Sequence, residues 1–308
     1  MWVTFRTVQD NSLNPINPFG LHILQIELTS LKIIGYYTET NKGEPLPNNL
    51  FITKNGELWG TGFFTEKNVP VLFHYDERND RFDSVLDQDK TLLSDYGNIH
   101  AIADKFRNVI WISRNETADS KLRVYKFDLS TQKMEEDKTL SKFNSSNFIV
   151  SPDGEVWVSV SDVTQGWYIA KYNPDRGDIR VYYPPSEFTE TPTWLLYYDH
   201  LGHIWMGDVG WLDLSYRDAL WYKMIPSPYF IMSDPTPEVR YRMLGAETIF
   251  ESSNGQLWFT GPQGLVRLSP DEGEWCLITS DHGSVYEDSS KNLWVVSYGV
   301  VYKRHLMP

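Results

Sequence analysis

The sequence is poor in cysteine, in positive charge and in long apolar runs. With one cysteine in 308 residues, the chain contains neither an intramolecular disulfide framework nor a Cys-x-x-Cys metal site. No stretch approaches the roughly 20 apolar residues that a transmembrane helix needs. Lys and Arg number 28 against 41 Asp and Glu, so the formal net charge is −13. Because nucleic acids and anionic membranes are usually bound by a basic face, we expect neither as a partner.

Signatures of the common enzyme classes are missing as well. The chain has no GxSxG elbow, Walker loop, HExxH helix or EF-hand spacing.

The chain also lacks a basic start followed by an apolar run, which at face value predicts a cytoplasmic protein, although a chain that begins within a repeat is compatible with a piece of a longer protein. No window shows a sustained 3.6-residue apolar period, so we expect few helices. Cys276 lies in the apolar run from Glu274 to Ile278 and is predicted to be a small core residue.

Aromatic residues are abundant, at 15% of the chain, and a short phrase recurs around tryptophan. In this phrase an aliphatic residue and a tryptophan follow a polar turn that usually holds a glycine, as in Gly154-Glu155-Val156-Trp157. Intervals of 36 to 57 residues separate successive copies, and periods of this size indicate a solenoid, an array or a propeller. The repeat units are centred on Trp2, Trp59, Trp111, Trp157, Trp205, Trp258 and Trp294.

Each copy divides into four short strands. An apolar run such as Phe148-Ile149-Val150 precedes a tight polar turn, and the tryptophan strand follows. The third strand repeats the pattern apolar-x-basic-aromatic-Asp/Asn, as in Val124-Tyr125-Lys126-Phe127-Asp128, and a fourth strand closes the copy. Four antiparallel strands per repeat are typical of a β-propeller blade, which buries both of its faces against its neighbours. We therefore predict an all-β fold, a single β-propeller domain over residues 1–308, with the tryptophans as core residues.

The two ends of the chain leave the number of blades open. The first copy reads as the second, third and fourth strands of a blade, and the last copy supplies only the first three. We prefer seven blades, the first without its inner strand and the last without its outer strand, because Trp2 then has a place. The alternative is six blades, with residues 31–38 as the outer strand of the final blade.

The repeat resembles that of a known family. The phrase D-x-x-G-x-L-W, followed by Gly-Leu-x-x-Tyr-Asp, is similar to the repeat of two-component regulator propellers and of the related streptogramin (virginiamycin B) lyases. The best copy runs from Ser252 to Gly261 and continues from Gly264 to Leu268, and the match covers nearly the whole chain. The lyases depend on a divalent metal and a few His and Glu residues. The histidines here do not align with theirs, so no catalytic residue is carried over.

Candidate binding residues follow from the way propellers bind ligands, along the central channel and on the loops at one mouth. The positions eleven residues before each repeat tryptophan lead into the first strand and should surround that mouth. They are Asn48, His100, Ser146, Trp194, Glu247 and Gly283, with His282 adjacent to the last. A His–Glu pair in this set could act as a base and its partner, or hold a divalent metal.

The long connection from Pro226 to Gly245 is a second candidate region, because long loops are often functional. Its candidates for contact with a partner are Tyr229, Phe230, Arg240, Tyr241 and Arg242, and packing over a blade edge is the alternative interpretation.

These patterns predict a non-enzymatic module that binds a small-molecule ligand or a protein partner, as the resemblance to the sensory propeller of two-component regulators implies. Such a module needs no cofactor. The alternative is a lyase or hydrolase of the streptogramin lyase-like type, acting at the channel mouth, and only this alternative requires a divalent metal.

Overall fold

The structure is a computed structural model that describes residues 1–6, 21–27, 30, 32–62, 69–85, 93–94, 99–116, 121–143, 145, 147–162, 166–186, 188, 196–207, 210–215, 219–223, 248–261, 264–269, 274–280, 283–297 and 300–304. Within these residues nearly all regular structure is β-strand, and the one helix, α1 (Lys138–Ser141), has four residues. The expectation of few helices is thus confirmed. In the described part of the chain, no helix is long and apolar enough to cross a membrane.

The chain divides into two compact units. Unit 1 comprises Met1–Val160 and Lys171–Arg180, and unit 2 comprises Ser161–Ala170 and Val181–Pro308. The boundary between them passes through one sheet, in which β14 (Phe148–Val150), β15 (Val156–Asp162), β16 (Gly166–Asn173) and β17 (Asp178–Tyr182) follow one another in chain order.

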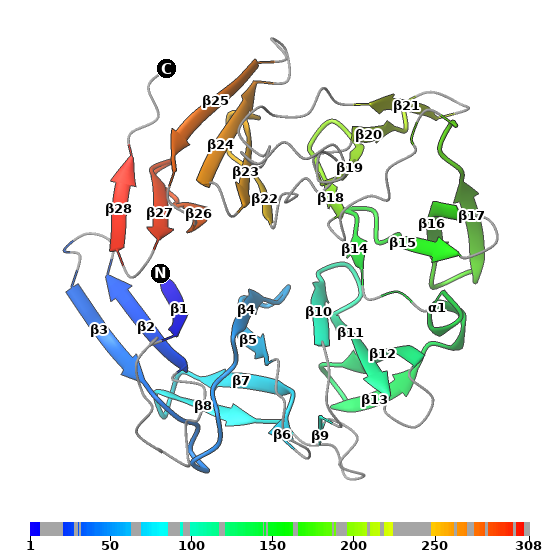
Figure 1. Cartoon of the computed structure of the whole chain (residues 1–308). Helices are drawn as coiled ribbons and strands as arrows, with labels where there is room; N and C mark the ends of the chain where they lie inside the picture. The colour runs from blue at the N-terminus through cyan, green and yellow to red at the C-terminus, as the bar shows by residue number, and fades with distance from the viewer. Residues whose placement is uncertain are drawn as a thin grey trace, which may run out of the picture. The chain divides into compact units, whose positions relative to one another are not determined.

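Unit 1 holds three further antiparallel sheets and a short strand pair, and Figure 1 shows the strands of each sheet beside one another. The first sheet has β1 (Trp2–Arg6), β2 (Leu21–Glu27) and β3 (Lys32–Tyr37). The second has β4 (Asn49–Ile52), β5 (Leu58–Thr61), β7 (Leu72–Asp76) and β8 (Arg81–Ser84), and the short pair is β6 (Val69–Pro70) with β9 (Leu93–Ser94). The third has β10 (Ile99–Asp104), β11 (Val109–Glu116), β12 (Lys121–Asp128) and β13 (Lys133–Glu136).

Unit 2 holds three sheets of the same antiparallel type. The first has β18 (Leu196–Tyr198), β19 (His203–Met206), β20 (Gly210–Asp213) and β21 (Leu220–Lys223). The second has β22 (Thr248–Glu251), β23 (Leu257–Gly261), β24 (Gly264–Ser269) and β25 (Glu274–Thr279). The third has three strands, β26 (Gly283–Glu287), β27 (Leu293–Ser297) and β28 (Val300–Arg304).

The fold is an all-β propeller of four-stranded antiparallel blades, as predicted, but the predicted number of blades is wrong. The described residues form five four-stranded blades rather than seven or six. The terminal copies each lack one strand, as predicted, and form three-stranded sheets, β1–β3 and β26–β28, that are not four-stranded blades. The six-bladed alternative also fails locally, since residues 32–37 pair with β2 and therefore belong to the first sheet.

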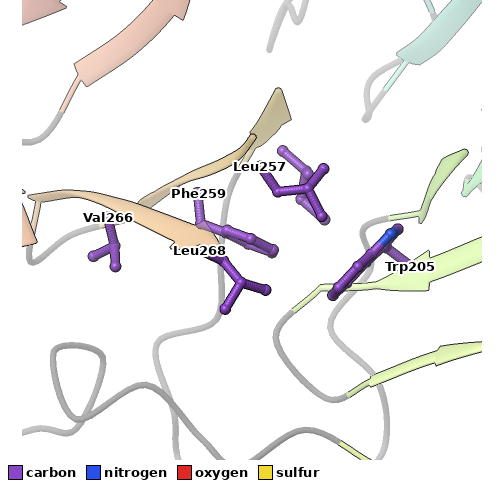
Figure 2. Packing of buried hydrophobic residues seen from close by; sticks show 6 residues of the cluster. Trp205, Leu257, Phe259, Val266 and Leu268 are labelled. Atoms are coloured by element: carbon purple, nitrogen blue, oxygen red, sulfur yellow. The ribbon is translucent and has the colours of Figure 1, made fainter. Parts of the chain in front are cut away.

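The six internal and C-terminal repeat tryptophans are core residues, with at most 4% of their surface exposed. In unit 2, Trp205 packs against Leu257, Phe259 and Leu268 of the following blade, and Figure 2 shows these side chains facing one another. The ring centroids of Trp205 and Phe259 lie 6.0 Å apart, edge to face. The prediction that the tryptophans fill the core is confirmed for these six, whereas Trp2 is only partly buried.

The basic residue of the third strand covers the face of the tryptophan. Trp59 lies opposite His74 in the strand register, with ring centroids 4.7 Å apart. The Nζ atom of Lys171 lies 5.5 Å from the Trp157 ring centroid, which is cation–π geometry. In the Trp205 copy the opposite residue is instead Trp211, whose ring stacks on Trp205 at 4.9 Å. The recurring basic residue is therefore part of the scaffold.

The prediction for Cys276 is wrong. The residue is exposed rather than buried, and it lies in β25, the edge strand of its blade, opposite Arg267. Because an apolar run in a fourth strand has a neighbouring strand on only one side, apolar composition by itself does not imply burial there.

Candidate functional site

Each blade has two ends that differ in chemistry. We call the end at which the first strand begins the leading end, and the end at which the first strand turns into the tryptophan strand the turn end. The predicted binding positions belong to the leading end. The polar turns of the repeat phrase belong to the turn end.

At the turn end, the buried indole N–H of the tryptophan donates to the residue that begins the turn. The pairs are Trp111–Asp104 (3.1 Å), Trp205–Asp199 (2.7 Å), Trp294–Asp288 (2.8 Å) and Trp258–Ser252 (3.1 Å). Burial opposes ionisation of Asp288, but hydrogen bonds from Trp294 and from Asn292 lower its pKa to about 2. The first residue of the turn thus anchors the tryptophan, so its chemistry serves the fold.

Turn-end residues also connect neighbouring blades. In unit 1, Asn55 Nδ2 donates to Asn108 Oδ1 at 3.3 Å, and Arg107 Nη1 donates to the Gly154 carbonyl. In unit 2, the backbone N–H of His200 donates to Glu251 at 3.0 Å, and the backbone N–H of Ser253 donates to Glu287 at 2.6 Å. The imidazole Nδ1 of His200 also contacts Glu251 Oε1. A His–Glu pair therefore exists in unit 2, at the turn end, where it joins two blades.

Arg107 makes the most extensive of these connections. It binds Asp175 in bidentate fashion, through Nε (2.9 Å) and Nη2 (2.7 Å), and binds the buried Asp104 through Nη1 (3.0 Å). The hydrogen bonds to Asp175 and Asp104 outweigh desolvation and raise the pKa of Arg107, while the same guanidinium lowers the pKa of Asp175. Such a paired arginine is committed to structure and is not available to a ligand.

Three of the predicted positions, Asn48, His100 and Gly283, are described by the structure, and Gly283 is the first residue of β26. Asn48 immediately precedes β4, and its backbone N–H donates to the Thr61 carbonyl at 3.0 Å. His100 is the second residue of β10, in the neighbouring blade, and β10 lies beside β4 within unit 1. Both therefore lie at the leading end, as predicted. The other candidates, Ser146, Trp194, Glu247 and His282, lie outside the described residues, and so do Tyr229, Phe230, Arg240, Tyr241 and Arg242.

His100 contacts the next blade through its imidazole ring. Its Nε2 atom lies 3.3 Å from the carbonyl oxygen of Phe148, and the two rings meet edge to face at 5.2 Å. The residue is solvent-exposed, yet desolvation by the surrounding protein lowers its pKa, and the bond to Phe148 only partly opposes this effect. His100 is therefore uncharged at neutral pH and can both donate and accept a hydrogen bond.

The residues around His100 carry polar groups without protein partners. Ser113 lies directly opposite His100 in the β10–β11 register, is 0% exposed, and its hydroxyl has no hydrogen-bond partner among the described residues. The same holds for the side-chain amide nitrogen of Asn147, which precedes Phe148. A buried polar group without a partner costs about 1–3 kcal/mol. We call His100, Ser113, Ser145 and Asn147 the leading-end cluster.

Ser145 shows the usual situation of a buried serine in this cluster. It is 5% exposed, its hydroxyl donates to the Ser159 carbonyl, and it accepts from the Asn147 backbone N–H at 3.1 Å. The hydroxyl of Ser145 is thus satisfied within the protein. The hydroxyl of Ser113, on β11, has no such partner among the described residues.

Sequence reasoning missed Ser113 and Asn147, although the sequence carries a signal for the former. A hydroxyl residue stands two positions after the tryptophan in five copies, and four of these residues, Thr61, Ser113, Ser159 and Thr260, are buried. Thr260 pairs its hydroxyl with that of Thr248 on the first strand at 2.5 Å. Only hydrogen-bond partners distinguish these positions, and those are not visible in the sequence.

Metal binding finds no support in the part of the chain that the structure describes. No group of three His, Cys, Asp or Glu side chains is arranged there to hold an ion. His203 binds the buried Asp199 through Nδ1 at 2.8 Å, while its Nε2 lies 3.9 Å from Asp213, so the three side chains form a polar cluster within one blade. The predicted partners Glu247 and His282 lie outside the described residues, so their pairing with His100 stays a prediction.

Comparison with known proteins gives matches in structure alone. No family model and no curated protein matches the chain. A chain provisionally described as the extracellular domain of a hybrid two component system from B. thetaiotaomicron is 17% identical, with a TM-score of 0.52. The match covers 81% of this chain and 32% of that one, so this chain spans about a third of its length.

Two other similar structures match over nearly their whole length. A protein from Lactobacillus plantarum is 14% identical, with a TM-score of 0.58, and a protein provisionally named as a 6-phosphogluconolactonase from Bacteroides uniformis is 12% identical, with a TM-score of 0.56. Both matches cover 99% of this chain and 92% of the other. At these identities the similarity concerns fold alone. The chain is thus similar in fold to known β-propellers, among them the extracellular domain of one two component system, in agreement with the resemblance of its repeat.

Proposed function

We propose that the chain is a ligand-binding propeller, comparable to the sensory propeller of a two-component regulator, and that it binds a small molecule at the leading end. The observation that supports this most is the leading-end cluster. There an exposed, uncharged histidine adjoins polar groups that the protein leaves without partners. At the turn end, by contrast, Arg107 and Asp104 are engaged in holding the fold together.

A thermal-shift screen with neutral, anionic and cationic small molecules tests this proposal. A ligand at one hundred times its Kd stabilises the folded state by about 2.7 kcal/mol. We expect the Tm increase to fall by more than half in His100→Ala. It should persist in His200→Ala, which removes an exposed histidine from the turn end. Equal responses of the two variants would contradict a site at His100, and a panel without any active compound would contradict the proposal itself.

The second candidate is a metal-dependent lyase or hydrolase at the leading end. The fold similarity to a protein provisionally named as a lactonase favours it, over 99% of this chain. The test is turnover of lactone substrates with added divalent metal and with a chelator, in the wild type, His100→Ala and Glu247→Gln. Chelator-sensitive turnover that both substitutions abolish would favour the enzyme, and its absence would favour the binding module.

A protein partner remains part of the proposal for the connection from Pro226 to Gly245. In this proposal its aromatic and basic residues contact a protein partner, independently of the ligand at the leading end. Deletion of this connection should then abolish partner capture while leaving the Tm response of the leading end unchanged.

A further inference from the structure

Ser113 is a buried hydroxyl that the protein does not satisfy. It is 0% exposed and without a partner among the described residues, whereas the nearby Ser145 engages both a carbonyl and a backbone N–H. Buried polar groups in native proteins are nearly always paired, so each exception needs an explanation. A group kept in the core against its effect on stability indicates a role outside folding.

The register gives this hydroxyl a direction. In an antiparallel pair, directly opposite residues project from the same face of the sheet, with Cβ atoms about 4.5–5.5 Å apart. Ser113 and His100 form such a pair, so the hydroxyl projects beside the imidazole. The imidazole in turn contacts Phe148, the residue after Asn147, whose amide nitrogen also lacks a partner. His100 on β10 and Ser113 on β11 thus lie on the same face of one sheet in unit 1, and Asn147 is next in sequence to the residue that His100 contacts.

The chemistry of these groups limits what they can bind. A serine hydroxyl both donates and accepts, a neutral imidazole does the same through its two nitrogens, and the free amide nitrogen of Asn147 donates. None of the three carries a formal charge, since desolvation keeps the imidazole neutral by lowering its pKa. Anions are usually bound by cations or by several convergent N–H groups. A ligand hydroxyl, which donates and accepts at once, complements this set better than an anion does.

We propose that Ser113, Asn147 and His100 form the hydrogen-bonding part of a site for an uncharged small molecule that carries hydroxyl groups. This inference rests on the proposed function and assigns the chemistry of its ligand. His100 is the exposed member and is held to Phe148 by a contact of 3.3 Å, longer than the usual hydrogen bond. In this proposal the His100 ring turns aside when the ligand binds, because Ser113 is 0% exposed in the structure.

The test compares Ser113→Ala with Ser145→Ala. Both substitutions remove one oxygen from a buried serine of the same cluster, and they differ in the partners that the oxygen has. We expect Ser113→Ala to leave the Tm unchanged or raise it, and Ser145→Ala to lower it. A lowered Tm for Ser113→Ala, equal to that of Ser145→Ala, would show that the hydroxyl serves the fold and would overturn the inference.

Binding is measured by titration calorimetry with myo-inositol as the neutral polyol probe and inorganic phosphate as the anionic probe. We expect the wild type to bind the polyol and not phosphate, and Ser113→Ala to lose affinity about tenfold with its Tm retained, as the loss of one buried hydrogen bond predicts. Phosphate binding that depends on His100 would leave the proposed function standing and overturn this inference. If neither probe nor any compound of the screen binds, both are overturned.

Discussion

The two ends of the blades differ in how completely their polar groups are paired. At the turn end, Asp104 accepts from two backbone amides, from the Trp111 indole and from Arg107, although it is only 1% exposed. At the leading end, Ser113 is equally buried and its hydroxyl accepts and donates nothing within the described residues. The comparison of these two residues places the candidate site at Ser113, whose hydroxyl is unpaired among the described residues, rather than at the fully paired Asp104.

The largest expected effect concerns the anchor of the tryptophan. Asp104→Ala removes a buried partner of Arg107 and of the Trp111 indole, and breaking such a buried charged interaction typically costs about 3–5 kcal/mol. Ser252→Ala removes only a neutral acceptor from Trp258, which costs about 1–3 kcal/mol. Urea unfolding, followed by tryptophan fluorescence, measures the loss of unfolding free energy in both variants. Equal losses would show that charge adds nothing to the turn-end anchor.

An intermediate effect separates backbone strain from packing between blades. Gly154 and Gly56 both have positive φ, +79° and +82°, and a side chain in that conformation costs about 1–2 kcal/mol. A Cβ atom at Gly154 would also lie 2.8 Å from the Phe106 ring, whereas a Cβ at Gly56 meets nothing within 4 Å. We expect Gly154→Ala to cost about 1–3 kcal/mol more than Gly56→Ala in urea unfolding, because crowding adds to strain. Equal costs would mean that Phe106 moves aside freely.

The smallest effect tests the leading end by pH. The folded protein holds the pKa of His100 below 6.5, so as pH falls through about 6.5 the unfolded chain takes up a proton that the folded chain resists. Stability contributed by neutral His100 is therefore present above that pH and declines below it. We expect the Tm difference between pH 7.5 and pH 5.5 to be about 1 °C smaller in His100→Gln than in the wild type. An unchanged difference would contradict desolvation of the ring.

Local features of the fold were predictable from the sequence because they depend on neighbours in the chain. The turn before each tryptophan needs positive φ at one position, and Asn108 and Lys291, which replace glycine there, have φ of 59° and 63°. The Asp or Asn that ends the third strand was visible as a pattern, and Asp128 and Asn173 cap the next turn by accepting backbone amides. The positions of Asn48 and His100 at the leading end followed from counting back from the tryptophan.

Features that depend on partners distant in the chain were not predictable. Cys276 has the composition of a core residue, but its strand is at the edge of a blade. The terminal copies form three-stranded sheets, as the sequence indicated, but the totals of seven or six blades were wrong, because only five four-stranded blades form among the described residues. The hydroxyl of Ser113 looks like those of Ser159 and Thr260 in sequence, and only its partners set it apart.

By itself, the sequence determined that the chain folds into antiparallel blades. The tight turns and the strands that are apolar on both faces depend on residues close in the chain, and the tryptophan phrase repeats them in every copy. The tertiary structure alone decided which polar groups remain unsatisfied, because a hydrogen bond between Arg107 and Asp175, or its absence at Ser113, depends on side chains that different strands bring together. That distinction turned one of several similar buried serines into the centre of a candidate site.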